Sequence, residues 1–179
     1  MSHDDSGKHR AFQPPAIIDV EASGFGSASY PIEVGLVLPT GHTFCSLIMP
    51  SSDWKHWDAS AERVHGVSRN TLQTHGKPAD HVAREVNGLL RGATVYCDSW
   101  YHDFNWLSRL FDAGDSVQAF QLEDIRSLLT QQEADAWQEA KAQVIDELKI
   151  ERHRASNDAR VLQATLVRVK TMQQPAASG

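Results

Sequence analysis

The chain has 179 residues, of which 41% are hydrophobic, enough for one domain with a buried core. Its formal net charge of −6 at pH 7 excludes a uniformly basic nucleic-acid-binding protein. It permits a local basic groove, and it fits a protein that gathers carboxylates around cations. The sequence contains neither a leader-like segment nor an apolar run of membrane-spanning length, so we expect a cytoplasmic protein that does not contact membranes.

Polar, aperiodic sequence at both ends predicts a flexible tail over residues 1–13 and another over 172–179, around a single domain over 14–171. Within the domain, residues 16–21, 30–38 and 42–49 read as strands. The Pro and Gly of "LPTGHT" predict a hairpin between the second and third strands. Cys45 and Cys97 are far apart and flanked by apolar residues, so we expect two reduced thiols in the core.

Helices and strands then alternate. We predict a short helix from near Ser60, a helix over 79–91, a strand over 93–97, a helix over 103–113 and a strand over 116–120, with helix for most of the remainder. A three-strand meander followed by alternating elements predicts an α/β fold. Its central sheet would be mixed and five-stranded, with helices on its faces.

The stretch "IIDVEASGFG", from Ile17 to Gly26, places two acids inside a strand that otherwise reads as buried. Side chains alternate between the faces of a strand, so Asp19 and Glu21 point the same way, about 7 Å apart. Two carboxylates this close repel each other unless a proton or a cation lies between them. Oxygen ligands favour Mg²⁺ or Mn²⁺ over zinc, so the pair predicts a divalent-cation site.

A second polar cluster lies in "HRASNDARVL", from His153 to Leu162. Ser156 is a favourable N-cap, which puts Asp158 in the first turn of a helix, where the helix dipole stabilises an anion. His153 and Asp158 would not share a face of one continuous helix. They converge only if His153 lies in the preceding loop, where it would suit a general base beside a metal. The alternative is a solvated histidine near an ordinary first-turn aspartate.

A third segment, "YCDSWYHDFNWLSRLF", runs from a predicted strand into an amphipathic helix and offers two further acids. Asp98 lies at the end of the strand, and Asp103 at the start of the helix. The residues alone leave open which of them would join the other acids.

These segments, with "PIEVGLVL" and "RVHGVS", occur in the order and spacing of the DEDDh 3′→5′ exonucleases. The chain resembles this DnaQ-like family from about Ile17 to Leu166. The family includes the proofreading subunit of bacterial replicative polymerases, ribonuclease T and oligoribonuclease. The pairing of D-x-E-x-x-G with H-x-A-x-x-D-A is the specific part of the match. The resemblance implies a ribonuclease H-like fold, in which Glu33 of "PIEVGLVL" would be structural.

The resemblance also implies a catalytic set, in which four acids hold two Mg²⁺ or Mn²⁺ ions and a histidine takes the proton from the attacking water. In this sequence the acids are Asp19, Glu21, Asp103 and Asp158, and the histidine is His153. His65 of "VHGVS" matches a position near the nucleotide. Ser23 and Phe25 match the loop beside the terminal base.

One departure from the family pattern concerns the third acid. Asp98, Ser99 and His102 stand where many relatives carry His, Asn and Phe. Asp103 is favoured by position, and Asp98 remains an alternative. Trp100 or Tyr101 would have to supply the substrate stacking that the missing residues provide, although either aromatic could equally pack in the core.

The implied activity is hydrolysis at the 3′ end of single-stranded DNA or RNA, giving nucleoside 5′-monophosphates. Two alternatives remain: a non-catalytic nucleic-acid-binding module of the same fold, and a hydrolase of short oligonucleotides or dinucleotides. Trp54 and Trp57 in a polar loop are candidates for base stacking. Basic residues near the C-terminal helix predict a rim that contacts phosphates, and the alternative is that they are ordinary solvated helix charges. They are Lys149, Arg152, Arg154, Arg160, Arg168 and Lys170.

The segment 128–149 is predicted to be a helix packed on the core, with a homodimer surface as the lesser alternative. The sequence does not indicate whether a polymerase partner exists.

Overall fold

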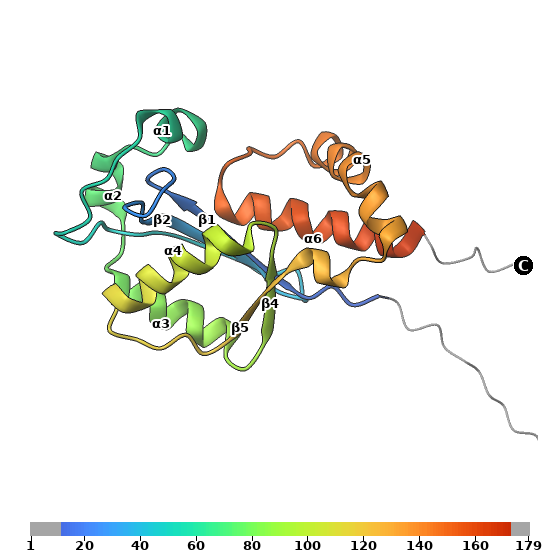
Figure 1. Cartoon of the computed structure of the whole chain (residues 1–179), viewed down its shortest axis with the longest axis horizontal. Coiled ribbons are helices and arrows are strands. Elements are labelled where there is room, and N and C mark those ends of the chain that lie inside the picture. The colour runs from blue at the N-terminus through green and yellow to red at the C-terminus, as the bar shows by residue number, and fades with distance from the viewer. Residues whose placement is uncertain (1–11, 173–179) are drawn as a thin grey trace, which may run out of the picture.

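Five strands form one mixed sheet in the order β3-β2-β1-β4-β5 in a computed structural model, which describes residues 12–172 (Figure 1). Strand β1 pairs antiparallel with β2, and β2 antiparallel with β3, whereas β4 runs parallel to both β1 and β5. The predicted meander followed by parallel strands is confirmed. The strands are β1 (Ala16–Ala22), β2 (Pro31–Val37), β3 (Thr43–Leu47), β4 (Thr94–Cys97) and β5 (Gln121–Asp124).

Six α-helices and one short 3₁₀ helix occur in the described residues. They are α1 (Ala59–His65), α2 (Arg69–His75), α3 (Ala79–Leu90), α4 (Trp100–Ala113), η1 (Ile125–Leu128), α5 (Gln131–Leu148) and α6 (Ala155–Met172). None of these helices is long and apolar enough to cross a membrane. The predicted tails lie almost entirely outside the described residues.

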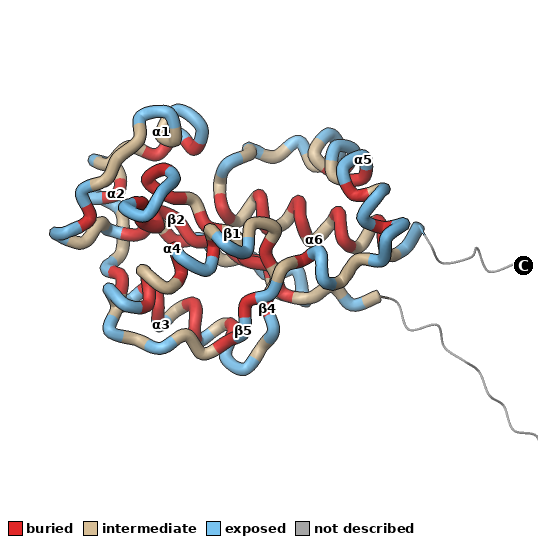
Figure 2. Tube along the Cα trace, in the orientation of Figure 1, coloured by how far each residue is buried: buried red, intermediate tan, exposed pale blue. Residues whose placement is uncertain are grey.

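Two apolar clusters cover the two faces of the sheet. Figure 2 shows the buried residues of the strands and helices in red. Alternation along β1 divides its side chains between them, because Ile18 and Val20 pack in the cluster that includes α3 and α4, whereas Ile17 packs with α5 and α6. Asp19 and Glu21 have the parity of Ile17. The two acids therefore continue the face that α6 covers.

The last strand lies further along the chain than predicted. Residues 116–120 form a loop, and Val117 is 86% exposed. The side chain of Asn87 in α3 donates to the Val117 carbonyl and accepts from the Ala119 amide, at 2.9 and 2.8 Å. These backbone groups are therefore not available to a strand ladder, and pairing with β4 begins at Gln121.

Smaller differences concern other helices and the cysteines. Helix α4 begins at Trp100, three residues before the predicted start, and α2 was not predicted. Both thiols are free, as expected, but Cys45 is exposed on β3, the edge strand, so only Cys97 is a core residue.

Candidate active site

A cavity of about 220 Å³ lies where the carboxyl end of β1 meets α4 and the loop before α6. Acids from all three predicted segments line it, so residues far apart in sequence meet in one place. The acids and the histidine in its wall are Asp19, Glu21, Asp98, Asp103, His153 and Asp158. The cavity therefore contains both candidates for the third acid.

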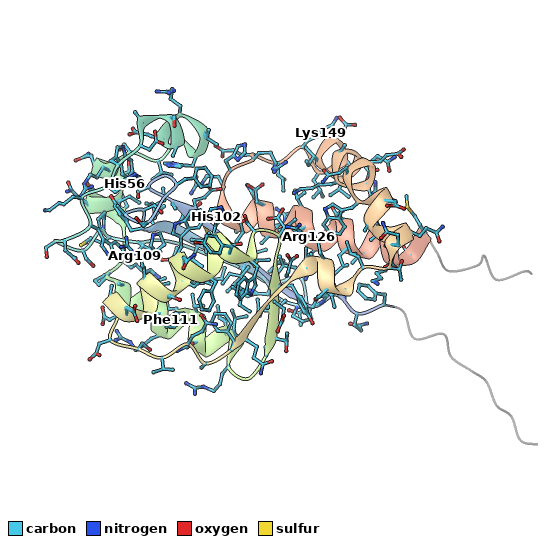
Figure 3. The ribbon with its side chains drawn as sticks, viewed as in Figure 1. His56, His102, Arg109, Phe111, Arg126 and Lys149 are labelled. Atoms are coloured by element: carbon cyan, nitrogen blue, oxygen red, sulfur yellow. The ribbon has the colours of Figure 1, made fainter. Side chains whose placement is uncertain are left out.

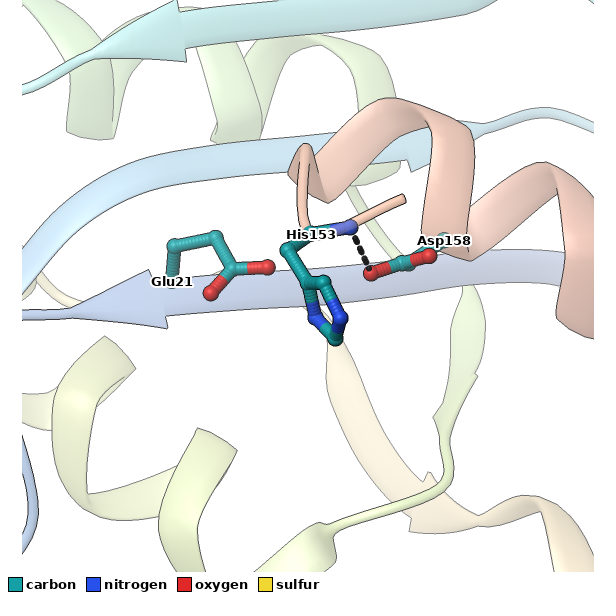
Figure 4. Close-up of side chains that lie close together, drawn as sticks. All are labelled: Glu21, His153 and Asp158. Atoms are coloured by element: carbon teal, nitrogen blue, oxygen red, sulfur yellow. Dashed lines mark hydrogen bonds between the residues drawn. The ribbon is translucent and has the colours of Figure 1, made fainter. Parts of the chain in front are cut away.

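Glu21, His153 and Asp158 form the tightest group in this cavity (Figure 4). Each offers a ligand atom, and these atoms lie within 4.8 Å of one another. The His153 backbone amide donates to Asp158 Oδ2 at 2.9 Å, which ties the loop to the first turn of α6. The expected convergence of His153 on Asp158 is thus reached from a loop residue.

The loop that carries His153 is fixed on both sides of the histidine. His153 itself has a left-handed backbone, with φ of 60°, which turns the chain sharply before the helix. On one side, Arg152 Nε donates to Asp158 Oδ1 at 2.5 Å. On the other side, Arg154 donates through Nη2 to Glu33 Oε1 at 2.7 Å and through Nε to the same carboxylate.

Glu33 and Gly35 on β2 seat the first turn of α6. The Glu33 side chain is fully buried, and besides Arg154 it accepts a hydrogen bond from the Ala155 amide at 2.9 Å. A Cβ at Gly35 would lie 2.0 Å from the Ser156 amide nitrogen, so only glycine allows the helix this close to the strand. The helix begins at Ala155, so Ser156 lies inside it and the expected N-cap at Ser156 is wrong. The Glu33 carboxylate accepts the hydrogen bond from the amide of Ala155, the first residue of the helix.

Burial and mutual repulsion raise the pKa of three acids in the cavity. Burial is the main cause for Asp19, with the Asp103 charge next, and its pKa lies well above the ordinary value. Burial, followed by the Asp158 charge, raises the pKa of Glu21 to about 7. Burial also raises the pKa of Asp103 to about 8. These acids therefore repel one another unless a proton or a cation lies among them, as the sequence predicted for Asp19 and Glu21 of β1.

The two candidates for the third acid differ in what surrounds them. Asp98 Oδ2 accepts a hydrogen bond from Lys141 Nζ of α5 at 2.9 Å, so this carboxylate already has a cation. Asp103 is only 1% exposed, and its Oδ2 is buried without a hydrogen-bond partner in the described part of the chain. An unpaired buried carboxylate oxygen is costly. Asp103 is therefore the acid that needs a cation.

A more apolar cavity of about 380 Å³ adjoins the acids and shares Glu21, Phe25 and His153 with their cavity. His65 lines it and is 5% exposed. His65 Nδ1 accepts from the Val67 amide, so the proton of the neutral ring lies on Nε2, which is buried without a partner among the described residues. Burial lowers the pKa of His65, which favours that neutral form.

The other predicted substrate residues fall into two groups. Phe25 and Tyr101 are each 70% exposed and border cavities near the acids. Ser23 is buried, and its hydroxyl accepts from the Tyr30 amide and bonds His56, so it shapes the loop that carries Phe25. Trp100 stacks on Phe104 and donates to the Leu122 carbonyl at 2.9 Å.

Most residues of the predicted basic rim, and both tryptophans of the predicted base-stacking loop, make contacts within the protein. Arg168 pairs with Glu147, and Lys170 with Glu133. Arg152 pairs with Asp158, and Arg154 pairs with Glu33. Of the rim residues, Arg152 lines the cavity.

The expectation that Trp54 stacks on bases is wrong, because its side chain is buried against Tyr30. The indole nitrogen of Trp57 donates a hydrogen bond to Glu62.

Sequence reasoning did not identify Lys141 and Trp106, which line the cavity, and it placed Arg152 in the basic rim without its pairing to Asp158. Trp106 is the one with a detectable signal, since it follows Asp103 by three residues and so lies one helical turn further along the same side of α4.

Comparison with solved structures yields several exonuclease I chains at high probability. Escherichia coli exonuclease I in complex with a dA16 oligonucleotide matches with a TM-score of 0.69 and 14% identity over 90% of this chain and 42% of that one. The zinc-ion-bound form of its complex with single-stranded DNA matches with a TM-score of 0.66 and 15% identity, over 90% of this chain and 41% of that one.

The chain shares the fold of exonuclease I. A moderately thermophilic exonuclease I from Methylocaldum szegediense matches with a TM-score of 0.66 and 15% identity, over 92% of this chain and 41% of that one. The chain thus spans about two fifths of the length of these exonucleases, and the expected ribonuclease H-like architecture is confirmed. No protein-family profile and no curated protein matches the sequence.

Proposed function

We propose that this protein is a metal-dependent 3′→5′ exonuclease of the DEDDh type that acts on single-stranded nucleic acid. The observation that carries the proposal is the cavity in which acids from three distant segments and His153 meet, with Asp103 Oδ2 buried and unpaired in the described residues. The exonuclease I structures of the same fold include complexes with DNA oligonucleotides, which supports single-stranded DNA as the first substrate to test.

The donor set fits divalent cations. Asp19, Glu21, Asp103 and Asp158 offer carboxylate oxygens, and Asp103 Oδ2 is an acceptor that the described protein leaves unsatisfied. Oxygen donors suit Mg²⁺ or Mn²⁺. Two such ions would activate a water molecule and stabilise the leaving 3′ oxygen.

His153 would act as the general base. Its ring belongs to the close group with Glu21 and Asp158, while its backbone is held by Asp158. The neutral imidazole ring has a nitrogen lone pair that can accept a proton from water. The water oxygen would bond to phosphorus as its proton passes to His153, while the bond from phosphorus to the preceding 3′ oxygen breaks and that oxygen takes up a proton from solvent water. The products are a nucleoside 5′-monophosphate and a strand one nucleotide shorter.

The neighbouring apolar cavity would hold the terminal nucleotide. Phe25 offers an exposed ring for its base, and His65 Nε2 offers a hydrogen-bond donor in the wall. Both residues border the same space as Glu21 and His153, so a nucleotide bound there would have its phosphate near the acids.

Digestion of a 5′-labelled single-stranded oligonucleotide tests the proposal. With Mg²⁺ or Mn²⁺, the wild-type chain should give a ladder of products shortened from the 3′ end, and Asp19→Asn and His153→Ala should abolish or strongly reduce it. Asp146→Asn, at an exposed acid of α5 outside this cavity, is the matched control and should digest normally. No ladder from the wild type, or an undiminished one from Asp19→Asn, would overturn the proposal. A series of substrate lengths in DNA and RNA separates this activity from a preference for dinucleotides.

A further inference from the structure

A groove of about 360 Å³ runs along α4 beside the catalytic cavity, and the proposed function does not account for it. One wall is the loop that follows β1, and the other is the outer side of α4. Its lining residues are Gly26, Ser27, Ser29, Tyr101, His102, Asn105, Trp106, Ser108 and Arg109. Trp106 also borders the cavity with the acids, so the two spaces are neighbours.

Aromatic rings form a continuous row from this groove to the active site. The Tyr101 and His102 rings lie 5.4 Å apart, and His102 is stacked on Trp106 at the same centroid distance. The Phe25 ring then meets His102 edge-on at 5.3 Å. Tyr101 and Phe25, at the two ends of the row, are the most exposed of these rings. Exposed rings are the surfaces on which unpaired bases stack.

The electrostatic character of the groove differs from that of the whole chain. The chain carries 23 acids against 17 lysines and arginines, yet no carboxylate is among the residues that line the groove. Arg109 supplies a positive charge, and Figure 3 labels it on the same helix as His102. Asn105 and the serines add neutral polar groups. This combination suits a polyanion that also presents flat bases.

Hydrogen bonds hold the walls of the groove in place and leave part of the Arg109 guanidinium available to a ligand. Arg109 donates through Nη1 to the Ala28 and Ser29 carbonyls at 3.0 and 2.7 Å, which leaves its Nε and Nη2 without a partner in the described chain. Trp106 Nε1 donates to Ser29 Oγ at 2.9 Å, and that hydroxyl donates to the Gly26 carbonyl. The loop is thus tied to α4, and the groove is preformed.

We infer that this groove binds the nucleotides on the 5′ side of the terminal one, with bases stacked on Tyr101 and His102 and a backbone phosphate against Arg109. The inference rests on the proposed function and extends it to the substrate strand. Arg154, Arg168 and Lys170 near α6 are poorer candidates for that contact, because each already pairs with an acid of this chain.

The groove also limits how far the strand is held. Beyond Arg109 the surface opens into another hollow, whose lining includes Asp53 and Asp112. Lys55 also lines that hollow, and together with Arg109 it only balances the two carboxylates, so the hollow offers phosphates no net positive charge and the favourable contacts end near Arg109. Affinity should therefore rise over the first few nucleotides and then level off as the strand lengthens.

Fluorescence anisotropy with 5′-labelled thymidylates, from mononucleotide to dodecanucleotide in Mn²⁺, tests the inference in an Asp103→Asn parent, in which digestion is expected to be strongly slowed. Tyr101→Ala should weaken binding of the longest oligonucleotide about tenfold, because one stacking surface is lost, and leave the mononucleotide, which does not reach the groove, little changed. Tyr101→Phe keeps the ring and should bind as the parent does. Asn105→Glu puts a carboxylate in the groove and should also weaken only the longer strands.

The controls are Asn105→Gln, which adds no charge, and Gln73→Glu, which adds the same charge at an exposed position on α2. Both should bind as the parent does. Equal binding by the parent, Tyr101→Ala and Asn105→Glu at every length would overturn the inference, provided that the wild-type chain digests oligonucleotides. Failure of the wild type to digest any of them would instead count against the proposed function.

Discussion

Glu33 and Asp103 are the two most deeply buried carboxylates in the described residues, at 0% and 1% exposure, and their surroundings are opposite. Glu33 accepts hydrogen bonds from Arg154, the Ala155 amide and the Cys45 thiol. Asp103 has an oxygen with no partner and a pKa raised to about 8 by burial. Burial alone therefore does not identify a functional acid. Of these two buried acids, Asp103 is the one that keeps an oxygen available to bind something else.

The comparison predicts its largest effect on catalysis at Asp103. Asp103→Asn removes a carboxylate proposed to hold a cation, so digestion of single-stranded DNA should slow by about a thousandfold or more, equivalent to several kcal/mol of lost transition-state stabilisation. Product formation measured under single-turnover conditions gives the rate. Asp146→Asn changes an exposed acid on α5, away from the cavity and the groove, and should retain the wild-type rate. A rate for Asp103→Asn close to that of the wild type would remove Asp103 from the site.

Glu33 should show its effect in stability first. Glu33→Ala leaves Arg154 and the Ala155 amide without their acceptor, so the free energy of unfolding should fall by about 3 kcal/mol. Urea denaturation measures this, with Glu123→Ala, an exposed acid on β5, as the control. Unchanged stability would mean that Glu33 does not hold the start of α6.

The raised pKa values predict how stability depends on pH in a chelating buffer. Glu21 and Asp103 have pKa values of about 7 and about 8 in the folded chain, against ordinary values of 4.5 and 3.8. The folded chain then binds more protons than the unfolded chain, so the contribution of these groups is present at low pH and is lost as pH rises through 7 to 8.

Thermal unfolding in EDTA at several pH values tests this dependence. In EDTA, the Tm of the wild type should fall relative to that of Asp103→Asn as pH rises toward 8. When Mn²⁺ replaces EDTA, the wild-type Tm should rise most at the upper end of this pH range. Parallel curves for the two proteins would show that Asp103 ionises as freely in the folded chain as in the unfolded one.

Asp98 should give the smallest effect. Its carboxylate lies in the cavity but already pairs with Lys141, so Asp98→Asn should lower the digestion rate only a few-fold. Comparison of its single-turnover rate with that of Asp103→Asn decides between the two candidates that the sequence left open. A loss at Asp98 as large as that at Asp103 would assign the third acid to Asp98.

Local patterns predicted the sheet and the orientation of single acids, whereas the meeting of acids from three distant segments was expected only from the family resemblance. Alternation in β1 was enough to put Asp19 and Glu21 on one face, and the position of Asp158 in a first turn follows from helix spacing. The strand at 116–120 was misassigned, because no local pattern reveals that Asn87 uses the backbone of that segment.

What the sequence could not supply was the pairing of charges across long separations. Glu33 and Arg154 are 121 residues apart, and Asp98 and Lys141 are 43 apart. No spacing rule indicates which acid receives which cation at such distances. For the same reason the basic residues near α6 read as a rim for phosphates, although several of them neutralise acids of this chain.

Calorimetric titration of the protein with Mn²⁺ tests most directly the claim that the unpaired acid belongs to a metal site. The wild-type chain should bind Mn²⁺, Asp103→Asn should bind it much more weakly, and Asp146→Asn should bind it as the wild type does. Absence of Mn²⁺ binding in the wild type, or equal binding by Asp103→Asn, would contradict the account.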